Sequence, residues 1–521
     1  MLGQLLNLIQ NSYDQGLDDY WLPPLVKCGA DNLPVGRVQD QDVLIFACRR
    51  GEREIQLTEA FVDPDFHHFP REYLSQLQFF PMVEYHRKYA DYPPLFHSIK
   101  PESPLGEVLA EHGLRQLRIA ESEKFAHVTY FFNGRREEPF PQEDWIMIPS
   151  IREAVHQNPQ MRSAEIAETL VQSLQTGHYE FALVNFAAGD IFGHIPDFQA
   201  QVACVEAIDQ ALGRIAAAAQ SLGYCLIVTA DHGLLEQAYL PDGSHSIGHT
   251  RAKVPFILVD PTVPHNTIFL APEGSLQHVA PTILNLLGLE QPNLMTGRSL
   301  VQPYLTSVKG VVLIVLDGFG IGAEARDTNP IYAADTPTLD RLYAHYPHTA
   351  LHASGTYVGL APDSGGNSET GHLTLGAGRI VPQDETRIPK NLTPLHLKEN
   401  SRFYHSIKHL SPEQSVHLLF LLSPKSSHGS TSEALSLLRV LQEWGAKQVY
   451  LHAITDGRSA PRFGAVKFLP ELQTALIDLG IGELVTVCGR GYMLDRSGYY
   501  LERTQSAYEA LVKGRGACWM G

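Results

Sequence analysis

An unbroken apolar run from Val311 to Leu316 ends directly at Asp317 and a glycine-rich turn, and this feature constrains the fold most. A strand that is apolar at every position is buried on both faces, which is typical of parallel sheets covered by helices. Residues 99–301 alternate further apolar runs with amphipathic helical patterns. The sequence therefore predicts an α/β fold with a parallel sheet.

Acidic and imidazole side chains follow other predicted strands in the same way. Strands are predicted at 181–186, 226–229 and 254–259. The polar side chains near their ends are Asp190, His194, Asp231, His232, His245 and His249. Residues four apart, such as the first two of these, share one face of a helix. Because open α/β sheets bind ligands at the carboxyl ends of their strands, we expect these side chains to meet near Asp317.

Ser368 stands at the centre of a short polar stretch, GNSETGH, at residues 366–372. Taken alone, such a stretch is typical of a surface turn, and a serine hydroxyl is a poor nucleophile until a base or a metal activates it. Carboxylates, imidazoles and a hydroxyl together suit Mn²⁺, Mg²⁺ or Zn²⁺, and two such ions are a known device for phosphoryl transfer. The strand-end residues therefore predict a metal site that activates Ser368.

Basic side chains follow the predicted strands in the two terminal parts of the chain. A strand at 43–47 is followed by Arg49, Arg50 and Arg53. Later strands end near His428, Asp456, Arg458, Arg490 and Arg496. Guanidinium groups match phosphate and carboxylate oxygens, so these residues predict an anion site. The alternative is a set of solvated strand ends with salt bridges.

Length and composition narrow the class further. A chain of 521 residues is expected to form two or three domains. Its formal net charge of -17 argues against nucleic acid or an anionic membrane as a partner. No apolar run has the length of a membrane span and no signal peptide is evident, so a cytoplasmic protein is expected. The six cysteines, at 28, 48, 204, 225, 488 and 518, contain no CxxC pair and are predicted to be reduced thiols.

Several segments resemble signatures of the cofactor-independent (2,3-bisphosphoglycerate-independent) phosphoglycerate mutases of the alkaline phosphatase superfamily. They are VLDGFG, GNSETGHLTLGAGR, HAITDGR, CGRGYMLDR, EKFAHVTYFFNGRREEPFP, LVNFAAGD and TADHG. Their order differs from the family's usual one, so the sequence resembles a circular permutation. The resemblance implies a parallel-sheet phosphatase domain at 99–382 and a smaller α/β transferase domain split between 1–98 and 383–521.

The resemblance also implies roles for individual residues. One metal site would comprise Asp190, His194 and His249, and the other Asp317, Ser368, Asp231 and His232. Lys124 would bridge the metal centre and the substrate. Substrate binding would involve His428, Arg458, Arg490, Arg496, Arg50 and Arg53. The implied reaction interconverts 3-phosphoglycerate and 2-phosphoglycerate through a phosphoserine and needs no bisphosphoglycerate. The resemblance also implies a monomer that binds two divalent ions. Mn²⁺ is the expected metal, with Mg²⁺ or Zn²⁺ as alternatives.

Some positions depart from the family pattern. Ser459 replaces an acidic residue after Arg458, Pro424, Lys425 and Ser426 replace a glycine-rich stretch, and Leu234 replaces an asparagine after DHG. These changes leave open a metal-dependent phosphatase, or a phosphomutase acting on another phosphorylated hydroxy acid. A protein of another class, which binds metal or ligand without catalysis, is the remaining alternative.

Overall fold

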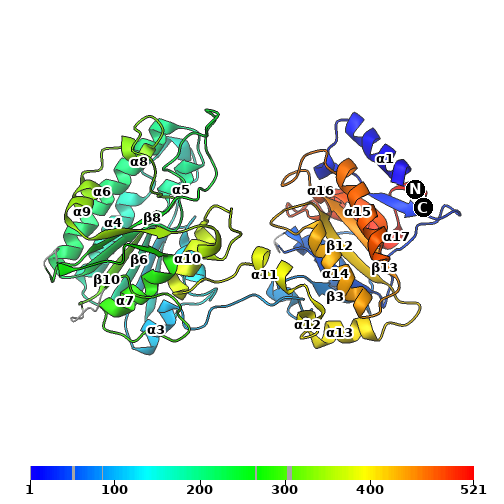
Figure 1. The fold of residues 1–521 in the computed structure, drawn as a ribbon, viewed down its shortest axis with the longest axis horizontal. Coiled ribbons are helices and arrows are strands. Elements are labelled where there is room, and N and C mark those ends of the chain that lie inside the picture. Colours follow the sequence, from blue (N-terminus) through cyan, green and yellow to red (C-terminus); the bar gives the residue numbers. More distant parts are fainter. Residues whose placement is uncertain (1, 50–52, 85, 264–266, 302–307, 521) are drawn as a thin grey trace. The chain divides into compact units, whose positions relative to one another are not determined.

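A computed structural model describes the whole chain except residues 1, 50–52, 85, 264–266, 302–307 and 521. The chain divides into two compact units (Figure 1). Unit 1 joins residues 1–98 to 384–521, and unit 2 comprises residues 99–383. None of the described helices is long and apolar enough to cross a membrane.

Unit 2 is built on an eight-stranded sheet in the order β5-β4-β6-β10-β7-β8-β11-β9. The strands are β4 (Gln116–Glu121), β5 (Glu143–Ile148), β6 (Phe181–Phe186), β7 (Cys225–Thr229), β8 (Val254–Val259), β9 (Glu273–Ser275), β10 (Val311–Leu316) and β11 (His348–His352). The five strands from β5 to β7 in this order are parallel, whereas β8 is antiparallel to both of its neighbours. The predicted α/β fold with a mainly parallel sheet is confirmed.

Strand β10 lies in the middle of this sheet, which explains its apolar sequence. All six of its residues are buried, and it pairs with β6 on one side and β7 on the other. Helices cover both faces of the sheet (Figure 1). Those over one face are α4 (Ser163–Gln175), α6 (Phe198–Leu222) and α9 (Pro337–His345), and those over the other are α3 (Leu105–Glu111), α7 (Val279–Leu286) and α10 (Ser368–Ala377).

Unit 1 contains a seven-stranded sheet in the order β15-β1-β14-β13-β12-β2-β3. The strands are β1 (Leu25–Cys28), β2 (Val43–Ala47), β3 (Gln78–Pro81), β12 (Val416–Leu422), β13 (Val449–Thr455), β14 (Glu483–Gly489) and β15 (Ala517–Met520). Strands from both ends of the chain are combined in this order, since β2 pairs with β12 and β1 lies between β14 and β15. Neither end of the chain can therefore complete the sheet without the other.

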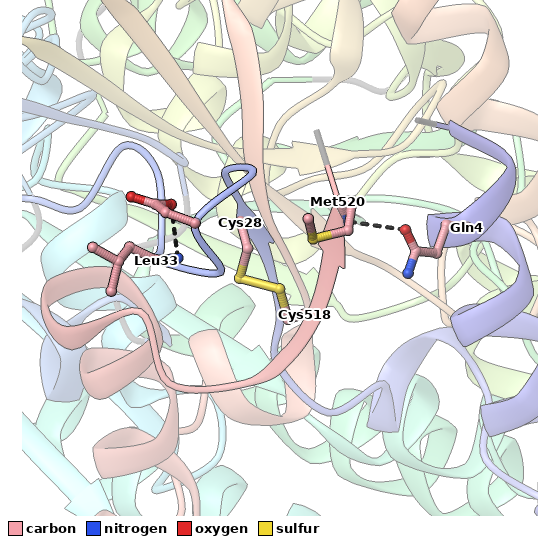
Figure 2. Close-up of a disulfide and its surroundings, with 6 residues drawn as sticks. Gln4, Cys28, Leu33, Cys518 and Met520 are labelled. Carbon is pink, nitrogen blue, oxygen red and sulfur yellow. Dashed lines mark hydrogen bonds between the residues drawn. A yellow bond between two sulfur atoms is a disulfide. The ribbon is translucent and has the colours of Figure 1, made fainter.

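Helices of both chain ends pack in unit 1 as well. They include α1 (Leu2–Asp14), α2 (Ile55–Val62), α14 (Thr431–Glu443), α15 (Ala465–Leu479), α16 (Arg490–Met493) and α17 (Gln505–Lys513). Helix α1 contacts the last strand, because the backbone N–H of Met520 donates to Gln4 Oε1 at 2.9 Å (Figure 2). The two termini thus lie beside each other within one unit.

A disulfide joins Cys28 on β1 to Cys518 on β15 (Figure 2). The prediction that all cysteines are reduced thiols is wrong for this pair, whereas the cysteines at 48, 204, 225 and 488 are free and buried. The two residues lie on adjacent parallel strands, with a Cα–Cα distance of 5.9 Å, although 490 positions separate them in the sequence. No local sequence pattern reveals a pairing that the sheet topology creates.

Candidate metal centre

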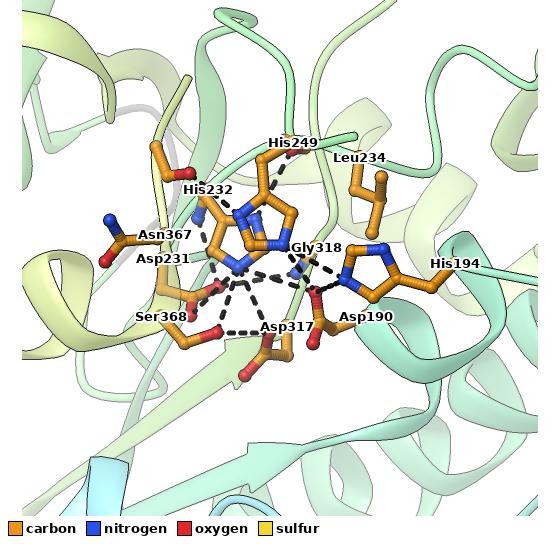
Figure 3. A network of polar contacts seen from close by, with 12 residues as sticks. Asp190, His194, Asp231, His232, Leu234, His249, Asp317, Gly318, Asn367 and Ser368 are labelled. Atoms are coloured by element: carbon orange, nitrogen blue, oxygen red, sulfur yellow. Dashed lines mark hydrogen bonds and ion pairs between the residues drawn. The ribbon is translucent and has the colours of Figure 1, made fainter. Parts of the chain in front are cut away.

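The carboxyl ends of β6, β10 and β7 bring three carboxylates together in unit 2 (Figure 3). Asp317 directly follows β10, Asp231 follows β7, and Asp190 lies in the short helix α5 (Ala188–Gly193) after β6. All three side chains are buried. Buried carboxylates require compensating positive charge, so this edge of the sheet demands cations.

Ser368 is the first residue of α10, and Asn367 caps the helix by accepting a hydrogen bond from the Thr370 N–H. The Ser368 Oγ lies 2.8 Å from Lys124 Nζ, 3.0 Å from His232 Nε2 and 3.2 Å from Asp317 Oδ1. The side chain is buried rather than part of a surface turn. Its place at a helix N-terminus also favours negative charge on or near the hydroxyl oxygen.

Lys124 supplies a cationic side chain that contacts two of the carboxylates and the serine together. It lies in the turn between β4 and the short helix His127–Phe131. Its Nζ is 2.6 Å from Asp190 Oδ2 and 2.9 Å from Asp317 Oδ1. Burial lowers the pKa of Lys124, but the surrounding carboxylates outweigh burial and hold the pKa above its usual value. The ammonium group therefore stays charged.

Asp190, His194 and His249 form a triangle of ligand-type atoms. The Nε2 of His249 lies 3.1 Å from Asp190 Oδ1 and 3.2 Å from His194 Nε2, and His194 Nε2 lies 3.4 Å from the same Asp190 oxygen. These separations suit a single ion bound at about 2.1 Å from each atom. His245, by contrast, contacts Tyr239 and lies outside the triangle.

Backbone carbonyls orient both imidazoles of this triangle. The Nδ1 of His194 lies 2.8 Å from Ile247 O, and the Nδ1 of His249 lies 2.8 Å from Gly366 O. An Nδ1–H that donates to a carbonyl turns Nε2 toward the carboxylate, which is the usual arrangement of metal-binding histidines. Burial raises the pKa of Asp190, but contacts with these two histidines and with Lys124 outweigh burial and hold that pKa well below its usual range.

His232 stands between this triangle and the other two carboxylates. Its Nε2 lies 3.4 Å from Asp317 Oδ1, 3.6 Å from Asp231 Oδ2 and 3.7 Å from Asp190 Oδ1. Burial lowers the pKa of His232, but the carboxylates outweigh burial and raise the pKa to about 9. Without metal the imidazolium thus acts as a counter-ion, which is consistent with a site that otherwise holds a cation.

Among the described residues, two groups could each hold a metal ion, because the ligand-type atoms within a group all lie within 4.8 Å of one another. The groups are Asp190 with His232 and His249, and Asp231 with Asp317 and His372. The second group contains a residue that the sequence prediction missed. His372 lies four residues after Ser368, one helical turn further along α10, so helical spacing was the signal that could have identified it. The donor set of carboxylates and imidazoles fits divalent Mn²⁺, Mg²⁺ or Zn²⁺.

In unit 1, three of the predicted basic side chains already have protein partners. Arg49 forms a buried ion pair with Glu433 at 2.9 Å, and Arg490 forms another with Asp456. The Arg53 Nη1 donates to Leu494 O at 3.3 Å. His428 is buried, Arg458 and Arg496 are exposed, and Arg50 lies outside the described residues.

Ser459 and Ser426, two departures from the family pattern, contact each other in this region. Their Oγ atoms are 3.2 Å apart, and the backbone N–H of Ser459 donates to Asp456 Oδ2 at 3.1 Å. The two hydroxyls thus occupy the carboxyl ends of β12 and β13 beside the Arg490 ion pair. A neutral hydroxyl pair interacts differently from an acidic side chain with a hydroxylated ligand.

Two known protein families match different parts of the chain. The family described as Metalloenzyme superfamily matches residues 86–291, which include the triangle and His232. The family described as BPG-independent PGAM N-terminus matches residues 2–87 and 388–519, on both sides of the first match. The chain is thus similar to metalloenzyme-superfamily proteins in its middle part and to 2,3-bisphosphoglycerate-independent phosphoglycerate mutases in its two terminal parts.

Curated relatives carry the name 2,3-bisphosphoglycerate-independent phosphoglycerate mutase. The Thermomicrobium roseum protein is 42% identical over 305 residues, 57% of each chain, and that of Nitrosococcus oceani is 41% identical over 294 residues, 56% of each chain. The chain thus spans little more than half the length of the curated relatives it matches. A crystal structure of Leishmania mexicana phosphoglycerate mutase at low cobalt concentration is 30% identical over 53% of both chains, with a TM-score of 0.42.

Proposed function

We propose that the chain is a phosphoglycerate mutase that interconverts 3-phosphoglycerate and 2-phosphoglycerate without bisphosphoglycerate. The observation that carries this proposal is the placement of the Ser368 hydroxyl among Lys124 Nζ, His232 Nε2 and Asp317 Oδ1 at the head of α10. The curated relatives at about 40% identity support the same activity. Residues 99–382 form the phosphatase domain in this proposal, and residues 1–98 and 383–521 form the transferase domain.

Two divalent ions complete the proposed site, and Mn²⁺ is the proposed metal. Asp190, His194 and His249 would hold one ion, and Asp317, Ser368, Asp231 and His232 the other. The bound ions would lower the pKa of the serine hydroxyl and neutralise charge on the phosphoryl group.

The chain's own residues carry the proposed transfer. Ser368 Oγ gives up its proton and attacks phosphorus, the bond from phosphorus to the 3-oxygen of glycerate breaks, and that oxygen takes up one proton, so the proton count is unchanged. The 2-hydroxyl then loses its proton and attacks the phosphoserine, which restores Ser368. Lys124, charged and in contact with Ser368 Oγ, stabilises the negative charge that develops in both steps.

In this proposal unit 1 supplies the groups that bind the substrate anion: His428, Arg458, Arg490, Arg496, Arg50 and Arg53. A small phosphorylated molecule is thus the proposed partner, bound by a cytoplasmic monomer.

Conversion of 3-phosphoglycerate to 2-phosphoglycerate by the Mn²⁺-loaded protein, without bisphosphoglycerate, tests the proposal. Free phosphate is measured in parallel. Conversion without phosphate release is expected. Absence of both reactions in a protein with a full metal content would overturn the proposal and favour the non-catalytic alternative.

A second candidate is a metal-dependent phosphatase, or a phosphomutase of another phosphorylated hydroxy acid. The Ser459–Ser426 hydroxyl pair favours it, because hydroxyls stand there without the acidic side chain of the family pattern. Phosphate release from small phosphoesters without isomerisation would support the phosphatase. Restoration of conversion by Ser459→Asp would locate the difference at this pair.

A further inference from the structure

His372 and Asn185 connect the nucleophile helix to two of the proposed ligand carboxylates. Both side chains are buried, His372 on α10 and Asn185 near the end of β6. Asn185 Nδ2 lies 2.7 Å from Asp317 Oδ2 and 3.2 Å from His372 Nε2. The Nδ1 of His372 lies 2.9 Å from the Ser368 carbonyl oxygen and 3.3 Å from Asp231 Oδ2.

The Asp317 carboxylate fixes the orientation of the Asn185 amide. An ionised carboxylate only accepts hydrogen bonds, so the amide atom that faces it at 2.7 Å must be the NH₂ nitrogen. The second hydrogen of this nitrogen is then available to His372 Nε2. Turning the amide over would place its oxygen against the carboxylate and leave His372 without this donor.

The orientation of Asn185 in turn fixes the proton of His372. A ring nitrogen that accepts from an amide carries no hydrogen, so the proton of the neutral imidazole is on Nδ1. That Nδ1–H donates to the Ser368 carbonyl and faces Asp231. Both ring nitrogens are thus engaged by protein atoms.

His194 and His249 show the contrasting arrangement. In both, Nδ1 faces a backbone carbonyl while Nε2 faces a carboxylate and the other imidazole. Their Nε2 lone pairs can bind an ion. The corresponding nitrogen of His372 faces an amide donor instead, so its lone pair is already used.

We infer that His372, held by Asn185, is a positioning residue that orients Asp231 and the Ser368 end of α10 and is not itself a metal ligand. The inference deepens the proposed function and rests on it only for the part that concerns turnover. It gives a structural reason for these two polar residues: the Asn–His pair links carboxylates from β10 and β7 and fixes their orientation.

The test uses the full-length protein and the variants His372→Ala, His372→Asn and Asn185→Ala. Mn²⁺ stoichiometry and affinity are measured by titration, and kcat and KM are measured with 3-phosphoglycerate. His372→Ala is expected to bind as many Mn²⁺ ions as the parent protein, with affinity for the weaker ion lowered about 10- to 100-fold. We expect kcat to fall while KM changes little, since the substrate does not contact His372 in this interpretation.

Conservative and double variants separate positioning from mere packing. His372→Asn keeps an N–H donor near the Nδ1 position and should recover part of the affinity. The double variant His372→Ala/Asn185→Ala should lose less affinity than the sum of the two single losses, because the two residues contact each other. His352→Ala, which removes an imidazole on β11 that pairs with Glu273, is the matched control and should leave Mn²⁺ affinity unchanged.

Loss of one bound ion in both His372→Ala and His372→Asn would identify His372 as a ligand and overturn the inference. Parent-like affinity and kcat in His372→Ala and Asn185→Ala would also overturn it. If His372→Ala does not fold, the other two variants decide. If the parent protein binds two ions but does not isomerise phosphoglycerate, the proposed function fails, while the Mn²⁺ affinities still test the positioning role.

Discussion

The carboxyl ends of the two sheets balance their buried charges in different ways. In unit 2, three buried carboxylates converge on one lysine, with Lys124 Nζ touching two of them and the serine. In unit 1, buried arginines each face a carboxylate of their own, Arg49 with Glu433 and Arg490 with Asp456. Similar topology therefore supports a centre that needs added cations in one unit and a region with internally balanced pairs in the other.

The pKa values of buried histidines also differ between the two units. Carboxylates around His232 in unit 2 outweigh burial and raise its pKa to about 9. In unit 1, burial together with the neighbouring His417 holds the pKa of His452 well below its usual value. Unit 2 thus stabilises positive charge in its interior, whereas unit 1 excludes it at this position.

The largest expected effect follows from assigning the chemistry to unit 2. Ser368→Ala should lower phosphoglycerate conversion by at least about 10⁴-fold, because no other hydroxyl takes the place of the nucleophile. Mass spectrometry should detect a phosphorylated residue in the parent protein and not in the variant. Ser364→Ala, a few residues earlier in the same loop, is the control. Retained turnover in Ser368→Ala would remove the catalytic distinction between the units.

Breaking a balanced pair in unit 1 should affect stability. Arg490→Met leaves Asp456 buried without its cation and should lower the free energy of unfolding of unit 1 by about 3–5 kcal/mol. The double variant Arg490→Met/Asp456→Asn should recover much of this loss. Denaturant unfolding measures both. An equal loss in the single and double variants would show that packing, not charge balance, dominates at this edge.

Removing the Lys124 ammonium group should separate catalysis from metal binding. Lys124→Met should lower kcat about 10²- to 10³-fold through lost stabilisation of developing charge. The site becomes more negative, so its Mn²⁺ affinity should not decrease. Titration with Mn²⁺ and steady-state kinetics test both statements, and a marked loss of Mn²⁺ binding would contradict the role of Lys124 as a counter-ion.

The disulfide should stabilise unit 1 and not unit 2. Cys28→Ser/Cys518→Ser should lower the free energy of unfolding of unit 1 by about 2–4 kcal/mol, the typical contribution of a disulfide. Reduction of the parent protein should have a similar effect. Hydrogen exchange resolved along the sequence would assign the change to a unit, and Cys204→Ser, at a free buried thiol of unit 2, is a suitable comparison.

The smallest effect concerns pH. The folded-state pKa of His452 lies well below its unfolded value near 6.5, so the unfolded state binds the extra proton and stability falls as pH decreases below about 6.5. One such group accounts for about 1 kcal/mol between pH 6.5 and 5.5. Unfolding of the parent protein and of His452→Gln at both values measures this contribution. An unchanged pH dependence in His452→Gln would assign the effect to other groups.

The sequence carried much of the fold and of the candidate site because both follow strand patterns. The apolar run of β10 fixed a buried parallel strand, and residues after β6, β7 and β10 were expected to meet because parallel strands end at one edge. The geometry brings Asp190, Asp231 and Asp317 together there. The roles assigned to them and to the arginines remain predictions.

What the sequence did not reveal depends on contacts between distant segments. His372 acquires its partners only when α10 packs beside Asn185 on β6 and Asp231 after β7. The disulfide requires β1 and β15 to lie side by side, although they come from opposite ends of the chain. Likewise, strand-end patterns do not reveal that Arg49 and Arg490 already have carboxylate partners.

The bond between Cys28 and Cys518 also changes the topology of the molecule. It closes a covalent ring that contains nearly the whole chain, with a sequence separation of 490 residues. A single protease cut at any peptide bond between these two cysteines would open the ring without dividing the protein into two molecules. Such nicked forms would migrate as one chain until a reductant is added, and each would have new termini at the cut while keeping every residue attached.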